Sequence, residues 1–138
     1  MNIPALPSDG AEKWEVQLRK GSLELAILAA LWEGPLYGLE ILRNLQSGSD
    51  LVVVEGTVYP LLTRLRSLGL VSSEWVESGS GHPRKYYRLT GAGRERVLAM
   101  ARIWARFSRS MSSLLAPLSQ ENPRQQQPGR QPLTTEKP

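Results

Sequence analysis

Apolar residues recur at helical spacing in the first half of this chain. A first stripe, interleaved with alanines, predicts a helix that begins at an N-cap Ser22 and ends at Gly34-Pro35. Its inward residues are Leu23, Ile27, Leu28 and Leu31. Tyr37–Leu45 predicts a second, shorter helix, with Ile41, Leu42 and Leu45 inward. The β-branched run Leu51–Val54 is compatible with a short strand.

A third apolar stripe predicts a helix from Thr57 to about Leu68. Its members are Val58, Leu61, Leu62, Leu65 and Leu68. With Thr57 as N-cap, Pro60 falls in the first turn, where the backbone nitrogen has no intrahelical acceptor. Gly69 occupies the position after a helix end that glycine favours.

The second half of the chain changes from strand to helix periodicity. Leu70–Glu77 and Arg84–Thr90 predict a hairpin around a long Gly/Ser loop, with Tyr87 and Leu89 facing inward. Gly91–Leu115 predicts one long helix with a narrow apolar seam at alternating spacings of three and four. The seam consists of Val97, Met100, Trp104, Phe107, Met111 and Leu114. Such a seam favours a partner helix, and a second copy of the chain is the simplest one.

These elements predict a mainly α fold with a small β-hairpin, namely a winged helix-turn-helix followed by a long C-terminal dimerisation helix. Residues 1–11 form a flexible arm, 12–90 the winged helix-turn-helix domain and 91–116 the dimerisation helix in this organisation. Residues 117–138 are rich in proline and glutamine and have too few apolar side chains to offset the entropy of ordering. We therefore expect a disordered tail there.

Charge is distributed unevenly along the chain. The net charge is only +4, but residues 1–55 hold four basic and eight acidic side chains, whereas residues 56–109 hold ten basic and three acidic ones. This concentration of positive charge in the segment of the third helix and the hairpin is typical of a surface that faces a polyanion.

Composition also excludes several classes of protein. The chain has no cysteine and a single histidine, His82, so thiolate metal sites, disulfide scaffolds and His-containing catalytic triads are disfavoured. No paired carboxylates, metal-ligand spacing or phosphate-binding glycine loop is apparent, so we expect neither an enzyme nor a cofactor. The beginning of the chain lacks the order of a signal peptide, and its apolar runs are too short to span a membrane, which favours a cytoplasmic protein.

Three strings of residues together resemble the PadR-like family of bacterial transcriptional regulators. They are LRKGSLELAILAALWEGPLYGLEILRNL at Leu18–Leu45, EGTVYPLLTRLRSLGLV at Glu55–Val71 and GHPRKYYRLTGAGR at Gly81–Arg94. The resemblance spans about 100 of the 138 residues. It implies a homodimeric DNA-binding regulator, most often a repressor, that binds an inverted-repeat operator and belongs to the smaller subgroup with one short C-terminal helix.

The outer faces of the third helix and the hairpin are the expected DNA-binding surface. The candidate residues are Thr57, Tyr59, Pro60, Thr63, Arg64, Arg66, His82, Arg84 and Lys85. Hydroxyls, a phenol and long cations suit base edges and phosphates. The alternatives are that the arginines are merely solvated, that Tyr59 packs under the hairpin, and that the hairpin cations only keep it soluble. His82 stands where the family usually has arginine, and Arg66-Ser67 where an acidic residue is frequent.

Two interpretations of Trp104 remain open. The resemblance implies that a tryptophan at this place lines a pore between two subunits and stacks on a small planar aromatic effector. A stripe of Met, Trp and Phe is otherwise the core of a dimer.

The alternative function for the whole chain is a winged-helix protein-interaction module without specific DNA binding.

Overall fold

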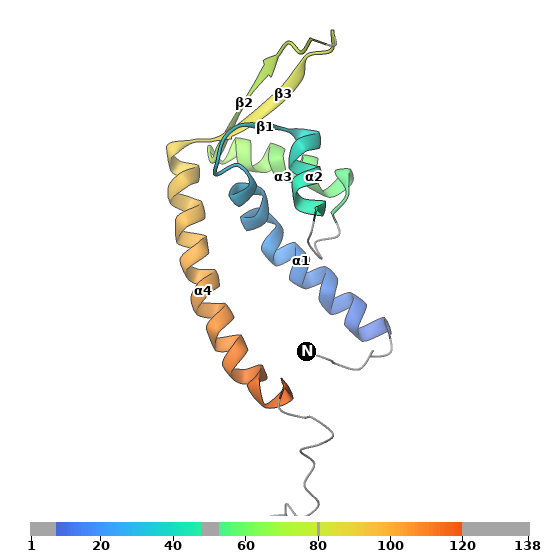
Figure 1. The fold of residues 1–138 in the computed structure, drawn as a ribbon, viewed down its shortest axis with the longest axis vertical. Helices are drawn as coiled ribbons and strands as arrows, with labels where there is room; N and C mark the ends of the chain where they lie inside the picture. The colour runs from blue at the N-terminus through green and yellow to red at the C-terminus, as the bar shows by residue number, and fades with distance from the viewer. Residues whose placement is uncertain (1–7, 48–52, 80, 120–138) are drawn as a thin grey trace, which may run out of the picture. The chain divides into compact units, whose positions relative to one another are not determined.

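The structure is a computed structural model that describes residues 8–47, 53–79 and 81–119. Its elements are α1 (Ser8–Ala30), β1 (Leu36–Tyr37), α2 (Gly38–Gln46), α3 (Glu55–Ser67), β2 (Val71–Val76), β3 (Arg84–Leu89) and α4 (Gly91–Ser119) (Figure 1). This order of helices around a small antiparallel sheet, followed by a long helix, confirms the predicted winged helix-turn-helix. None of the helices within the described ranges has the length and apolar character needed to cross a bilayer.

The chain divides into two units, each of which is described by itself. The larger unit ends at Trp104 and contains α1, α2, α3, the sheet and the first half of α4. The described part of the smaller unit is the second half of α4, residues 105–119.

Helix α1 is longer than the sequence predicts, because Ser22 is not its N-cap. The helix begins at Ser8, and the Ser22 hydroxyl lies inside it, donating a hydrogen bond to the Leu18 carbonyl at 2.9 Å. Serine makes such a bond to the preceding turn in helix interiors. Residues 8–11, assigned to the flexible arm by composition, are therefore helical, whereas residues 1–7 lie outside the described chain. The predicted stop before Pro35 is confirmed by the turn that follows Ala30.

The sheet has a third strand that the sequence pattern does not predict. Strand β1 pairs antiparallel with β3, so that Leu36 lies opposite Tyr87 and Tyr37 opposite Tyr86. The predicted hairpin is confirmed as β2 and β3, with Leu70, Glu77 and Thr90 just outside the strands, and the strand order is β1-β3-β2. Because β1 leads directly into α2, the middle of β3 is paired with the segment that begins that helix.

Helix α2 follows the prediction closely. Its N-cap is Tyr37, whose backbone N–H donates to the Glu40 Oε1 at 3.1 Å, as in a capping box. The sequence suggests a short strand at Leu51–Val54. Val53 and Val54 are not in a strand, and residues 51 and 52 lie outside the described chain.

Helix α3 begins earlier than predicted, and the predicted roles of Thr57 and Pro60 in its first turn are wrong. The N-cap is Val54, so Thr57 lies within the first turn and its N–H donates to the Val54 carbonyl at 3.0 Å. Pro60 is consequently inside the helix. Proline has no amide hydrogen, so it cannot bond the Gly56 carbonyl four residues earlier. That carbonyl lies on the exposed side of the helix, where water can solvate it.

The C-terminal end of α3 forms the turn that Gly69 predicts. Gly69 has a φ of 75°, and its N–H donates to the Arg66 carbonyl at 3.0 Å. The N–H of Leu70 donates to the Leu65 carbonyl, also at 3.0 Å, which completes a Schellman motif. Leu70 and Leu65 are both buried, so the turn also directs the chain back into the core.

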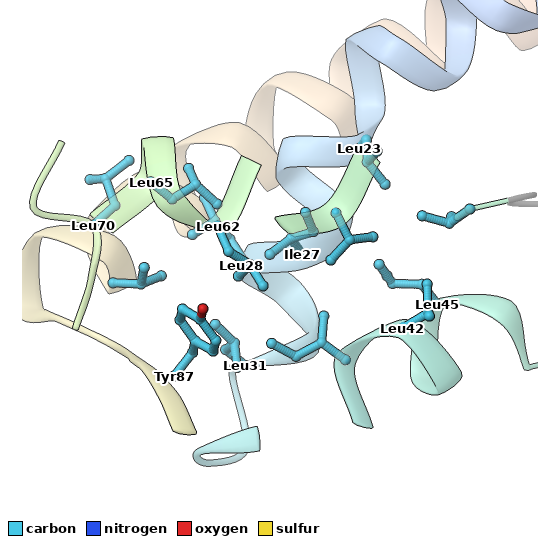
Figure 2. Packing of buried hydrophobic residues seen from close by; sticks show 14 of the residues in the cluster. Leu23, Ile27, Leu28, Leu31, Leu42, Leu45, Leu62, Leu65, Leu70 and Tyr87 are labelled. Atoms are coloured by element: carbon cyan, nitrogen blue, oxygen red, sulfur yellow. The ribbon is translucent and has the colours of Figure 1, made fainter. Parts of the chain in front are cut away.

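The core lies where α1, α2 and α3 meet the sheet. Figure 2 shows Tyr87 of β3 pointing toward Leu28 of α1 and toward Leu31, in the turn that follows α1. The most completely buried side chains are Ile27, Leu28, Leu31, Ile41, Leu62, Leu65, Val58 and Val71. Each contributes about 1.5–3 kcal/mol relative to an exposed position. Every predicted inward residue of the first two helices is buried, but Leu68 is 51% exposed because it is the C-cap, beyond the apolar face.

Helix α4 starts at a joint that it shares with the end of α3. The Thr90 hydroxyl accepts a hydrogen bond from the Gly93 N–H at 3.0 Å and donates one to the Gly69 carbonyl at 2.6 Å. The Thr90 N–H also donates to the Leu70 carbonyl at 3.1 Å. One residue therefore caps α4 and binds the turn that ends α3.

The first turns of α4 also pack against the core. The Arg94 guanidinium lies 4.2 Å from the ring centre of Trp32, in the turn after α1. Val97 is only 5% exposed inside the core, and Met100 packs against that core. The assignment of Val97 to a dimer interface is therefore wrong, because its side chain is covered within its own chain. At the other end, residues 117–119 are helical rather than part of the predicted tail, and residues 120–138 lie outside the described chain.

Candidate nucleic-acid interface

The outward side of α3 is set by three buried residues, Val58, Leu62 and Leu65. With 100° per residue, the side opposite to them carries Gly56, Pro60, Thr63 and Ser67, all of them exposed. We call these four residues the central stripe. Their side chains are small, so a ligand surface can approach the helix backbone closely. The Thr63 hydroxyl bonds the Tyr59 carbonyl at 3.1 Å and the Ser67 hydroxyl bonds the Arg64 carbonyl at 2.7 Å.

One flank of the central stripe carries Arg64. Its Nη1 lies 3.8 Å from the Glu24 Oε2 on α1. The arginine side chain is 62% exposed, whereas that of Glu24 is 21% exposed. A long ion pair in this setting is weak, so the guanidinium can turn toward another anion at little cost.

The other flank carries Arg66, which reaches the hairpin. Its Nη1 donates a hydrogen bond to the Ser73 hydroxyl of β2 at 3.2 Å. A guanidinium has five N–H donors, so this bond leaves others available to a phosphate. The two arginines thus stand on opposite sides of a row of small residues.

Tyr59 combines an exposed edge with a structural contact. Its side chain is 39% exposed, and its phenol ring lies against the backbone of Gly38, so close that a β-carbon there would stand 2.7 Å from the hydroxyl oxygen. Burial raises the pKa of the neighbouring Tyr87 phenol above 10.0, and the Tyr59 phenol raises it further, whereas Arg66 lowers it. Tyr59 therefore packs against the start of α2 and leaves one edge exposed.

The two faces of the hairpin differ in character. On the face that continues into the core, the Lys85 ammonium lies 5.8 Å from the ring centres of both Trp75 and Tyr87. On the opposite face, the Arg84 guanidinium lies 4.5 Å from the ring centre of Tyr37. Farther along that face, Arg88 forms a 2.7 Å ion pair with Glu74. The predicted alternation, with Tyr87 inward, is confirmed.

His82 lies in the loop between the strands and is exposed. Its carbonyl accepts a hydrogen bond from the Ser78 hydroxyl at 2.6 Å, and Gly81, with a φ of 84°, donates its N–H to the Ser78 carbonyl. These bonds narrow the described part of the loop into a turn, with His82 exposed beside it.

The structure places the predicted DNA-binding residues in two groups, on α3 and on the hairpin, and Arg66 bridges the groups through Ser73. Sequence reasoning missed Gly56 and Ser67 of the central stripe, although the helical wheel that identified the core also identifies its opposite side. It also missed Glu24, whose approach to Arg64 depends on how two helices pack.

The apolar seam of α4 is exposed beyond its first turns. Trp104 is 46%, Phe107 53% and Leu114 73% exposed, while Met111 is half-buried. Trp14 of α1 is exposed as well. So many large apolar side chains at the surface of one chain are typical of an interaction surface.

Known proteins resemble this chain over most of its length. The family model described as "Transcriptional regulator PadR-like family" matches residues 27–99. A PadR-like transcription factor from Bacteroides fragilis is 42% identical and covers 74% of this chain and 98% of its own, with a TM-score of 0.62. A PadR family regulator from Eggerthella lenta is 34% identical, with coverages of 78% and 93% and a TM-score of 0.68. A PadR-like regulator from Bacillus cereus is 33% identical, with coverages of 72% and 96% and a TM-score of 0.66.

Proposed function

Because this chain belongs to the PadR-like family of transcriptional regulators, and is thus a DNA-binding regulator, we propose that it binds an inverted-repeat operator as a homodimer and represses transcription. In this proposal, α3 enters the major groove and the hairpin lies on the adjacent backbone. A two-fold dimer presents two copies of α3, so the half-sites lie about one helical turn, roughly 10 bp, or a multiple of it apart.

The observation that carries the proposal is the central stripe of α3 and its flanks. Small residues allow the helix to come close to base edges, and in this proposal the exposed Arg64 and Arg66 on its flanks contact phosphates of the two strands. Thr57, Tyr59, Pro60 and Thr63 supply the shorter contacts. Arg84, Lys85 and His82 add the contacts of the hairpin.

The exposed seam supports the homodimer. Phe107 and Leu114 lie more than half exposed in a single chain, and a second copy of α4 would cover them. Met100, Trp104 and Met111 complete the interface on this proposal. Repression follows from a dimer that occupies promoter DNA and blocks access to it.

We propose further that a small planar aromatic effector releases the repressor. Trp104 lies in the middle of the seam, 46% exposed, where an effector between two subunits could stack on its indole. A ligand that binds the released arrangement more tightly than the DNA-bound one lowers operator affinity by that difference.

Binding to duplex DNA across a salt series tests the function. We expect the logarithm of the binding constant for the promoter of the chain's own gene to fall linearly with the logarithm of salt concentration. Arg64→Ala plus Arg84→Ala should weaken binding and reduce the slope by about two, or roughly one per lost phosphate contact. Anisotropy of a labelled duplex measures both.

The matched control is Arg96→Ala plus Arg102→Ala, which removes the same charge from exposed positions on α4. This variant should keep operator binding. A folded parent chain without salt-dependent binding to duplex DNA would favour the protein-interaction module instead. A double variant at Arg64 and Arg84 that binds like the parent would exclude those contacts.

A further inference from the structure

Trp75 is an exposed indole that the proposed function does not use. It is 67% exposed, although it lies within β2 rather than in the loop. The strand register places it opposite Lys85, two pairs beyond Ser73 and Tyr87 on the same face of the hairpin. That face packs on the core at its base and extends outward past α3 (Figure 1).

A groove of about 530 Å³ lies between this face of the hairpin and the C-terminal end of α3. Arg66, Ser73, Trp75 and Lys85 are among the residues that line it. The hydrogen bond from Arg66 to Ser73 joins its two sides, and the Lys85 ammonium lies 5.8 Å from the indole centre. The groove therefore combines two cations with an exposed aromatic ring.

The electrostatics of the groove favour an anion. None of the described residues that line it is acidic. The nearest acidic position in β2, Glu74, points to the opposite face of the strand and pairs with Arg88 at 2.7 Å. Arg66 and Lys85 are thus not neutralised by a carboxylate within the groove, and an anion placed there gains both charges.

We propose that the sugar-phosphate backbone of one DNA strand lies in this groove, with a phosphate near Arg66 and Lys85 and a deoxyribose against the indole of Trp75. The inference rests on the proposed function and adds Trp75 as a DNA-contacting residue. Arg66 connects the groove to the central stripe of α3, so a strand that leaves the major groove passes into it. The DNA backbone alternates sugars and phosphates, and the groove offers an aromatic ring (Trp75) for a sugar and cations (Arg66, Lys85) for a phosphate.

Removing the ring and removing the charge should change binding in different ways. Trp75→Ala should weaken operator binding roughly five- to tenfold, the size of one lost aromatic contact, with an unchanged salt slope. Lys85→Ala should weaken binding and reduce the slope by about one. Trp75→Phe should restore most of the affinity, because it keeps an aromatic face.

The hairpin supplies matched controls on its opposite face. Val76→Ala shortens the adjacent exposed side chain, and Arg88→Ala removes a cation that is paired with Glu74. Both should bind DNA within about twofold of the parent. In addition, operator DNA should change the tryptophan emission of the parent, and Trp75→Phe should remove most of that change.

The outcomes separate this inference from the function on which it rests. A parent that fails to bind duplex DNA refutes the proposed function. A parent that binds with the expected salt slope, alongside a folded Trp75→Ala variant of equal affinity, refutes the groove alone. Inorganic phosphate that changes Trp75 emission as fully as duplex DNA would also refute it, because the groove would then bind free anions. Circular dichroism of each variant confirms folding.

Discussion

A β-carbon on Gly93 would collide with the carbonyl oxygen of Leu70, because the first turn of α4 passes directly over the turn that follows α3. Gly93→Ala should therefore lower the free energy of unfolding by about 2–3 kcal/mol, since backbone rather than a flexible side chain must move. Urea denaturation measures the change. Gly91→Ala is the control, because nothing lies within 4 Å of its β-carbon, and it should cost nothing. Equal stability of the two variants would contradict the close approach.

Pro60→Ala should stabilise the protein. Pro60 lies inside α3, and an alanine there supplies an amide hydrogen for the Gly56 carbonyl. We expect the free energy of unfolding to rise by about 1 kcal/mol, measured by thermal or urea unfolding. Pro60→Gly restores the same amide but adds chain flexibility, so it should be about 1 kcal/mol less stable than the alanine variant. A less stable Pro60→Ala variant would show that the proline ring itself makes a stabilising contact.

The raised pKa of Tyr87 predicts that the folded protein loses stability at alkaline pH. Burial, and secondarily the Tyr59 phenol, raise the pKa of Tyr87 in the folded chain above the unfolded value of 10.0. Below pH 10 the phenol is protonated in both states, so its contribution to stability is fully present. As pH rises past 10 toward the folded pKa, the unfolded state loses the proton first, and the contribution declines. Unfolding measured from pH 8 to 11 should show this decline.

Substituting Tyr87 separates its titration from that of the other ionisable groups. Tyr87→Phe removes the phenol, so its stability should fall less steeply between pH 10 and 11 than that of the parent. Tyr86→Phe, which changes the neighbour on the opposite face of β3, should retain the steeper decline. Parallel pH profiles for the parent and Tyr87→Phe would contradict the raised pKa.

Two charges in the exposed seam should abolish the proposed homodimer. Trp104→Glu plus Phe107→Glu places like charges at the middle of the seam, and the chain should sediment as a monomer and lose operator binding. Ala105→Glu plus Arg109→Glu changes the other side of the same helix and should remain dimeric. A dimer that survives the first pair of substitutions would show that α4 does not form the interface.

Tryptophan emission tests the proposed effector site. A planar cationic aromatic compound should quench emission of the parent in a saturable manner and weaken operator binding. Trp104→Phe should lose most of the quenching. Equal quenching in Trp104→Phe would mean that another of the four tryptophans is the reporter, and that the seam is only a dimer core.

The predicted core was largely correct because amphipathic periodicity is a local property of the sequence. Ile27, Ile41 and Leu62 are inward in helices whose spacing already identifies that face. Strand β1 was missed because two residues carry no periodicity, and its pairing with Tyr86 and Tyr87 joins positions about fifty residues apart along the chain.

Helix starts were less predictable, because a serine or threonine can either cap the start of a helix or lie inside it. Ser22 bonds its own preceding turn and Thr57 lies within a first turn, although each has the side chain of an N-cap. The real N-caps of α2 and α3 are Tyr37 and Val54, which a search for Ser, Thr, Asp and Asn cannot find. The candidate site was predictable to the extent that it is the opposite of the core face. The link from Arg66 to Ser73 was not, because it depends on tertiary packing.

The joint at Thr90 connects the turn at the C-terminal end of α3 to the first turn of α4. Because Thr90 binds both Gly69 and Gly93, a tilt of α4 at its first turn is passed to the C-terminal end of α3. Helix α3 is about 20 Å long, so a tilt of about 5° displaces its far end by roughly 2 Å. That far end carries Gly56 and Thr57, and 2 Å is enough to separate a hydrogen-bonded pair. In the proposed complex with DNA, this leverage makes the first turn of α3 sensitive to the orientation of the first turn of α4.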